Sequence, residues 1–178
     1  MRFKDFYKKQ VVPRLMQDFG FKNNMAAPRL EKVTVNVGLG PGLKDSKYVE
    51  AVEKTLTKIT GQKPVPTKAK KSISSFKIRK GMDIGMKVTL RGPRMYDFVE
   101  RLINIALPRV RDFRGIAPKV VDENGNISIG IRESHVFPEI KAEEVQTVHP
   151  LEVTITTTAK SHEHGLALLK YLGFPFKS

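Results

Sequence analysis

The segment from Gly38 to Ser46 is the first place where residue types and spacing suggest chemistry. It reads Gly-Leu-Gly-Pro-Gly-Leu-Lys-Asp-Ser, between a strand-like and a helix-like run, which is the setting of a phosphate-binding loop. The spacing does not match, because Leu43 and Asp45 flank Lys44 where a P-loop needs Gly before the Lys and Ser or Thr after it. Leu43 also stands where the third Gly of a dinucleotide fingerprint belongs. We therefore interpret the glycines as a tight turn and keep a phosphate-handling enzyme as the alternative.

The histidines and acids give little support for catalysis or metal binding. His162 and His164 are two residues apart, which puts them on different sides of a helix, and neither His135 nor His149 lies at metal-ligand spacing. Glu133 and His135 would make an acid–base pair, but no nucleophile motif such as G-x-S-x-G accompanies them. The chain has no Cys, which excludes a disulfide, a thiolate zinc site and a cysteine nucleophile. We predict no metal, no cofactor and no enzymatic activity.

Positive charge is concentrated in residues 60–94. This window holds ten Lys or Arg and one acid, Asp83, so 35 residues carry +9 of a net charge of +14. Solvated surfaces usually mix the two signs, and cations this dense repel one another unless a polyanion neutralises them. The window therefore favours binding to RNA over a plain charged face. An anionic membrane surface would fit the charge, but no apolar run approaches the roughly 18 residues of a spanning helix, so we predict no membrane association.

Hydrophobic spacing predicts the elements that must position this charge. Residues 31–39, 84–91, 127–131 and 151–156 alternate apolar with other residues, which is typical of strands with one buried face. Stripes at helical spacing predict four helices. The first spans 3–19 with Pro13 kinking or restarting it and Gly20 ending it, and the others span 46–60, 92–107 and 162–172, the last with Leu166, Leu169 and Leu172 facing inward.

Strands with one apolar face predict an α+β fold. We expect a mainly antiparallel sheet with helices packed on one face and a polar, RNA-binding opposite face. Residues 72–80 are expected to pair with the strand at 84–91. We predict a single domain over 1–178, with an extended basic loop at 71–83 and a peripheral lobe at 108–149. The open face would present Lys32, Thr34, Asn36, Lys87, Thr89 and Arg91, groups suited to phosphates and 2′-hydroxyls.

Two later segments differ in charge from the basic window. Residues 108–119 carry a net +3, and residues 122–146 carry a net −4. An acidic lobe beside a basic one would repel RNA and suits contact with a basic protein. An ordinary solubilising surface explains the same charges equally well, and a protein–protein scaffold that used this lobe alone would leave the basic window unexplained.

Several motifs, in order along nearly the whole chain, resemble the ribosomal protein L5 family of the large subunit, bacterial type. They are VNVGLG at 35–40, TGQKPVPTKAKKSISSFKIR at 60–79, LRGPRMYDF at 90–98, LPRVRDFRG at 107–115, FPEI at 137–140 and LGFPF at 172–176. The resemblance implies a cytoplasmic, structural protein of the ribosome that binds 5S rRNA in the central protuberance and also touches 23S rRNA. It further implies neighbours L18 and, in many bacteria, L25, a basic loop near the P-site tRNA, and an intersubunit bridge with small-subunit protein S13.

The resemblance also implies site residues. Expected 5S rRNA contacts are Lys32, Thr34, Asn36, Gln62, Lys63, Thr67, Lys68, Lys87, Thr89 and Arg91. The loop near tRNA is expected to use Lys70, Lys71, Ser72, Lys77, Arg79 and Lys80. The bridge is expected to use Arg109, Arg111, Phe113 and Arg114, together with Glu143 and Glu144.

Overall fold

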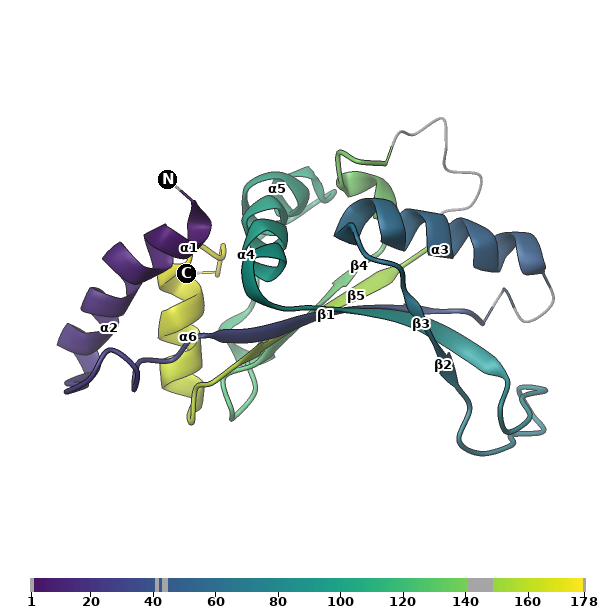
Figure 1. Ribbon diagram of the computed structural model, residues 1–178, viewed down its shortest axis with the longest axis horizontal. Helices are drawn as coiled ribbons and strands as arrows, with labels where there is room; N and C mark the ends of the chain where they lie inside the picture. The colour runs from purple at the N-terminus through teal and green to yellow at the C-terminus, as the bar shows by residue number, and fades with distance from the viewer. Residues whose placement is uncertain (1, 41, 43–44, 141–148, 178) are drawn as a thin grey trace. The chain divides into compact units, whose positions relative to one another are not determined.

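The protein folds into two compact units. The computed structural model describes residues 2–40, 42, 45–140 and 149–177 (Figure 1). One unit, here the terminal unit, comprises Met1–Val33, Leu90–Ile129 and Thr154–Ser178. The other, here the hairpin unit, comprises Thr34–Thr89 and Gly130–Val153. No helix among the described residues is both long and apolar enough to cross a bilayer.

A five-stranded antiparallel sheet confirms the predicted α+β class. Its order is β2-β3-β1-β5-β4, so the first strand is central and β2 and β4 form the edges. The strands are β1 (Leu30–Gly38), β2 (Val65–Lys68), β3 (Asp83–Leu90), β4 (Ile127–Ile131) and β5 (Leu151–Thr157).

The period-two pattern of β1 separates its two faces as expected. Its valines at alternate positions are at most 1% exposed, because successive side chains of a strand point to opposite faces. Residues of the other face are half-buried, and these are Lys32, Thr34 and Asn36.

Helix α3 (Ser46–Thr60) belongs to the hairpin unit, and both its ends follow local rules. The Asp45 side chain accepts a hydrogen bond from the Lys47 backbone N–H at 2.9 Å, which caps the first turn. Gly61 ends the helix at φ 67°, a left-handed conformation that glycine adopts without steric cost. Its buried residues include Tyr48, Val52, Leu56 and Ile59.

The terminal unit contains the other helices. They are α1 (Phe3–Phe6), α2 (Val12–Phe19), α4 (Gly92–Arg101), α5 (Leu107–Arg109) and α6 (His162–Tyr171).

Two prolines lie inside otherwise continuous helical runs. A π-helical segment, Tyr7–Val11, links α1 to α2 and ends two residues before Pro13. The segment Leu102–Ala106 likewise links α4 to α5 and ends two residues before Pro108. Proline lacks the N–H that would bond the carbonyl four residues back, so a wider turn accommodates it and the helix restarts.

Two details of the sequence interpretation were wrong. Beside β1, the other partner of β3 is β2, with Thr67 opposite Gly85, whereas residues 72–80 fold on themselves through an Ile73–Ile78 bridge. β2 was missed because it is only four residues long and contains Pro66, which a strand tolerates at a sheet edge. In α6 the predicted inner residue Leu169 is fully buried, but so is Leu168, which was not predicted, while the predicted inner residue Leu166 is half-buried.

Candidate nucleic-acid interface

Asn36 and Thr67 converge over a glycine on the polar face of the hairpin unit. Residues paired across antiparallel strands share a face, so Thr67 and its partner Gly85 lie on the same side. A Cβ placed on Gly85 would lie 2.7 Å from Thr67 Oγ1, 3.2 Å from the Val37 carbonyl oxygen and 3.8 Å from Asn36 Oδ1. The missing side chain thus leaves a space bordered by both the Thr67 hydroxyl and the Asn36 amide. Together they offer donors and acceptors suited to a ribose or a phosphate.

Cations flank this pair. Lys87 is exposed and opposes Val65 across the ladder, two positions along from Gly85 on the same face. Lys68 is exposed beside an irregularity in the β2–β3 register. Neither ammonium group has an ion-pair partner among the residues that the structure describes. Both charges are therefore available to an anion from outside.

Gln62 and Lys63 follow the end of α3. Thr60 Oγ1 donates to the Leu56 carbonyl at 2.7 Å and accepts from the Gln62 N–H at 3.3 Å, which fixes the turn. Lys63 Nζ lies 3.3 Å from Glu53 Oε1, with the lysine side chain 83% exposed. An ion pair this exposed contributes little to stability, so Lys63 can exchange Glu53 for a phosphate at small cost.

The remaining predicted 5S contacts divide between the units. Thr34 and Thr89 belong to the hairpin unit and are half-buried. Lys32 and Arg91 belong to the terminal unit. The Arg91 side chain is 60% exposed, and its guanidinium lies 3.9 Å from the Glu31 carboxylate, a weak surface pair of the same kind as Lys63 with Glu53.

The predicted basic loop is a hairpin with its own hydrogen bonds. Ala69 and Met82 pair at its base, and Ile73 and Ile78 exchange two backbone hydrogen bonds at 2.9 and 3.0 Å near its tip. Ser72 Oγ accepts the Lys80 backbone N–H at 2.9 Å, so this hydroxyl has a structural partner. The predicted cations are all exposed along the hairpin, and these are Lys70, Lys71, Lys77, Arg79 and Lys80.

The tip of the hairpin also carries exposed apolar side chains. Phe76 is 69% exposed and Ile73 is 44% exposed. Lys77 stands between Phe76 and Ile78 at φ 56°, which is uncommon for a residue other than glycine. The tip therefore combines cations with an aromatic ring, a combination that suits both phosphates and bases.

Four of the predicted bridge residues lie at the end of α5 and in the chain that follows it. Arg109, Arg111 and Arg114 are exposed and Phe113 is half-buried, all within the terminal unit. Glu143 and Glu144 lie outside the described residues.

The structure offers no support for a phosphate-binding loop or a metal site. Leu43 and Lys44 lie outside the described residues, but Asp45 already places a carboxylate at the start of α3, where it would repel a phosphate. The His162 ring bonds the Val121 carbonyl at 3.1 Å, and the His164 ring packs edge-on against Phe19. Within 2–40, 42, 45–140 and 149–177, no three His, Cys, Asp or Glu side chains are placed to hold a metal ion.

The convergence over Gly85 was not predicted from the sequence. The available signal was a lone glycine inside a strand pattern, which often marks the close approach of another group.

Comparison with known proteins identifies the family. The model described as "Ribosomal protein L5" matches residues 23–79, and the model of the C-terminus of the same ribosomal family matches residues 83–176. The protein "Large ribosomal subunit protein uL5" of Herpetosiphon aurantiacus is 56% identical over 176 residues, covering 99% of this chain and 98% of the relative. The proteins of the same name from Desulforamulus reducens and Anaeromyxobacter sp. (strain K) are 54% and 52% identical, covering 98% and 99% of this chain and 97% and 98% of their own. The chain belongs to the ribosomal protein L5 family.

Proposed function

We propose that this protein binds 5S rRNA through the polar sheet face of its hairpin unit and thereby helps to build the central protuberance. Membership of the L5 family makes it a structural protein of the large ribosomal subunit and not an enzyme, and bacterial ribosomes work in the cytoplasm. Contact with rRNA follows from this family, whereas the choice of 5S rRNA and of individual residues is our proposal.

The observation that carries the proposal is the convergence of Asn36 and Thr67 over Gly85, flanked by Lys68 and Lys87 without counter-ions among the described residues. Cations neutralise phosphates and supply most of the affinity, and this electrostatic contribution does not depend on the RNA sequence. The amide and the hydroxyl fix the position of the backbone, because they hydrogen-bond to ribose or phosphate oxygens in one geometry. A strand-borne site holds these groups in place before the RNA arrives.

The test is the salt dependence of 5S rRNA binding, measured by filter titration. For contacts with about six phosphates, the slope of log K against log salt should lie near −4 to −5. Lys87→Gln should weaken binding and make the slope less steep by about one unit. Lys54 is an exposed residue of α3 in the same unit, so Lys54→Gln is the matched control and should change neither the affinity nor the slope. Equal effects of the two substitutions, or a slope near zero, would contradict the proposal.

Two further contacts are proposed for the same particle. The hairpin at 69–82 projects exposed cations and Phe76, which suits contact with the P-site tRNA. The exposed arginines at 109–114, with the acidic segment at 122–146, suit the intersubunit bridge with S13. Contacts with 23S rRNA, with L18 and, where it is present, with L25 belong to the same proposal.

A further inference from the structure

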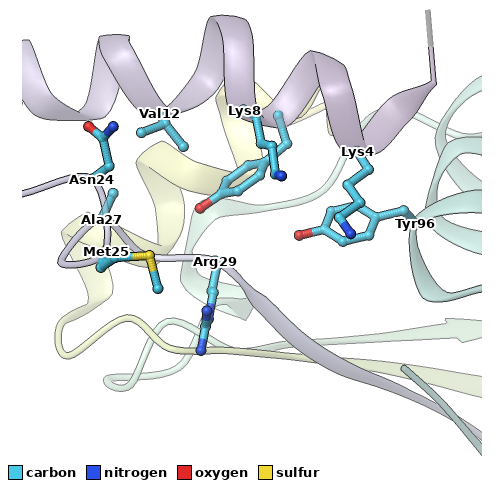
Figure 2. A pocket seen from close by; sticks show the side chains of 9 residues that line it. Lys4, Lys8, Val12, Asn24, Met25, Ala27, Arg29 and Tyr96 are labelled. Carbon is cyan, nitrogen blue, oxygen red and sulfur yellow. The ribbon is translucent and has the colours of Figure 1, made fainter. Parts of the chain in front are cut away.

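A second candidate site lies in the terminal unit and shares no residue with the set proposed to bind 5S rRNA. It is a cavity of about 340 Å³ between the N-terminal helical run and the segment that leads into β1 (Figure 2). Tyr7 and Val12 line it from the helical run, Ala27 from the segment before β1, and Tyr96 from α4. Met25, at the opening, is 74% exposed. A largely apolar hollow of this volume is within the usual range of small-molecule pockets.

Three cations surround this cavity and no acid lines it. Lys4 and Lys8 are four residues apart on the helical run, so they share one face. Arg29 lies across the opening from them (Figure 2). Its backbone is held by two hydrogen bonds with Thr158, at 3.0 and 2.9 Å. None of the three charged groups has an ion-pair partner among the described residues. The cavity is therefore suited to an anion.

Tyr96 adds a hydrogen-bond donor without a protein partner among the described residues. The residue is only 7% exposed, and its ring packs against Phe3 and Tyr7 at centroid distances of 6.5 and 6.1 Å. The Tyr7 hydroxyl donates to the Pro28 carbonyl at 3.0 Å, whereas the Tyr96 hydroxyl has no such acceptor within the described chain. Burial raises the pKa of Tyr96, so this hydroxyl stays protonated at neutral pH. Although the Tyr96 ring is buried, its hydroxyl oxygen remains accessible from the cavity, where it can donate to a ligand in place of water.

We propose that this cavity binds one unpaired nucleotide of RNA. The phosphate lies among Lys4, Lys8 and Arg29, and the base covers the apolar wall beneath Met25. The Tyr96 hydroxyl donates to an oxygen or ring nitrogen of the same nucleotide. A nucleotide joins an anion to a flat, largely apolar ring, which matches both halves of the cavity. The site shares no residue with the proposed 5S face, so either proposal can fail without the other.

Nucleotide binding to the full-length protein tests this proposal directly. With methyl-labelled methionine, NMR should show the Met25 signal shifting and saturating as 5′-AMP is added, while the signal of buried Met86 stays in place. Inorganic phosphate should bind at least about tenfold more weakly, because it leaves the apolar wall uncovered. An unmoved Met25 signal, or equal affinities for 5′-AMP and phosphate, would overturn the proposal.

Substitutions connect the binding to the named residues. Arg29→Gln should weaken 5′-AMP binding about tenfold, and Tyr96→Phe, which keeps the buried ring, about three- to tenfold. Lys54→Gln, in the other unit, is the matched control and should leave the affinity unchanged. Thermal unfolding of each variant verifies the fold. If folded Arg29→Gln and Tyr96→Phe bind 5′-AMP as tightly as the unsubstituted protein, the assignment of this cavity is wrong.

Crosslinking in assembled large subunits identifies the natural occupant. A photoreactive residue at position 25 should crosslink to rRNA at one unpaired nucleotide. A crosslink to an acidic protein segment, or no crosslink in fully assembled particles, would overturn the proposal.

Discussion

Gly85→Ala is the most direct structural test of the candidate interface. A Cβ at this position would lie 2.7 Å from Thr67 Oγ1 and 3.2 Å from the Val37 carbonyl oxygen, both closer than an ordinary contact. The hydroxyl must therefore swing away, and the backbone of β1 must shift slightly. Overpacking of this kind typically costs about 1–3 kcal/mol of unfolding free energy. Ala also has less conformational entropy than Gly in the unfolded state, which stabilises the folded protein by about 0.4–1 kcal/mol. We therefore expect a net loss of about 1–2 kcal/mol of unfolding free energy.

A matched control and a double-mutant cycle isolate the cause. Gly38→Ala places the same methyl group at the end of β1, where a Cβ meets nothing within 4 Å, and should be neutral or slightly stabilising. Thr67→Ala removes the clashing hydroxyl, so Gly85→Ala should cost about 1 kcal/mol less in that background. The measurement is urea unfolding, with the midpoint and the slope fitted for all variants. If Gly85→Ala and Gly38→Ala change the unfolding free energy equally, or if Thr67→Ala does not reduce the cost of Gly85→Ala, the close approach of Thr67 to Gly85 is refuted.

Three further predictions test other parts of the molecule. Asn36→Ala and Arg91→Ala should each weaken 5S rRNA binding by about 1–3 kcal/mol in filter titrations, and an unchanged affinity in the double variant would remove the sheet-face assignment. Deletion of 71–80 should impair tRNA placement but leave 5S binding largely intact, because the hairpin closes on itself through Ala69 and Met82. Loss of 5S binding would contradict the assignment of 5S rRNA to the sheet face and of tRNA to the hairpin. Burial, with a smaller effect of Tyr96, raises the pKa of Tyr7 from 10.0 to about 12. The stabilising contribution of neutral Tyr7 is therefore complete below about pH 10 and is lost as the pH rises through 12. In urea unfolding, Tyr7→Phe should lose less unfolding free energy between these pH values than the unsubstituted protein does. An equal loss in both proteins would contradict this assignment.

The fold was predictable where the cause is local. A side-chain oxygen before an apolar stripe is a strong start signal for a helix, so the sequence indicates Asp45 or Ser46 as one cap and Ser161 as another. In the structure Asp45 and Ser161 each accept a backbone N–H of the first turn. The alternating valines of β1 similarly predicted its buried face. β2 was not predicted because four residues that include a proline are too few to show an alternating pattern. Its pairing with β3 also depends on residues 69–82, which join the two strands.

The site was predictable by residue type but not by geometry. A local excess of cations indicates a polyanion, whatever the arrangement in space. Thr67 and Asn36 border the same space because Thr67 pairs with Gly85 in the β2–β3 register. The sequence interpretation had instead paired residues 72–80 with β3, so it could not place Thr67 there. The pocket around Tyr96 depends on helices distant in sequence, and an unpaired hydroxyl has no sequence signal at all.

Exposed ion pairs leave two of the predicted RNA-binding cations accessible to a phosphate. Lys63 and Arg91 each hold a nearby carboxylate at the surface, at 3.3 and 3.9 Å. These pairs reduce repulsion among the cations, but exposure keeps each one weak, so a phosphate can replace the carboxylate at little cost. Burying the same cations would have required strong internal partners, and breaking those would oppose binding. Under the proposed function, the exposed placement of these two cations therefore lets them bind phosphates without breaking a strong internal contact.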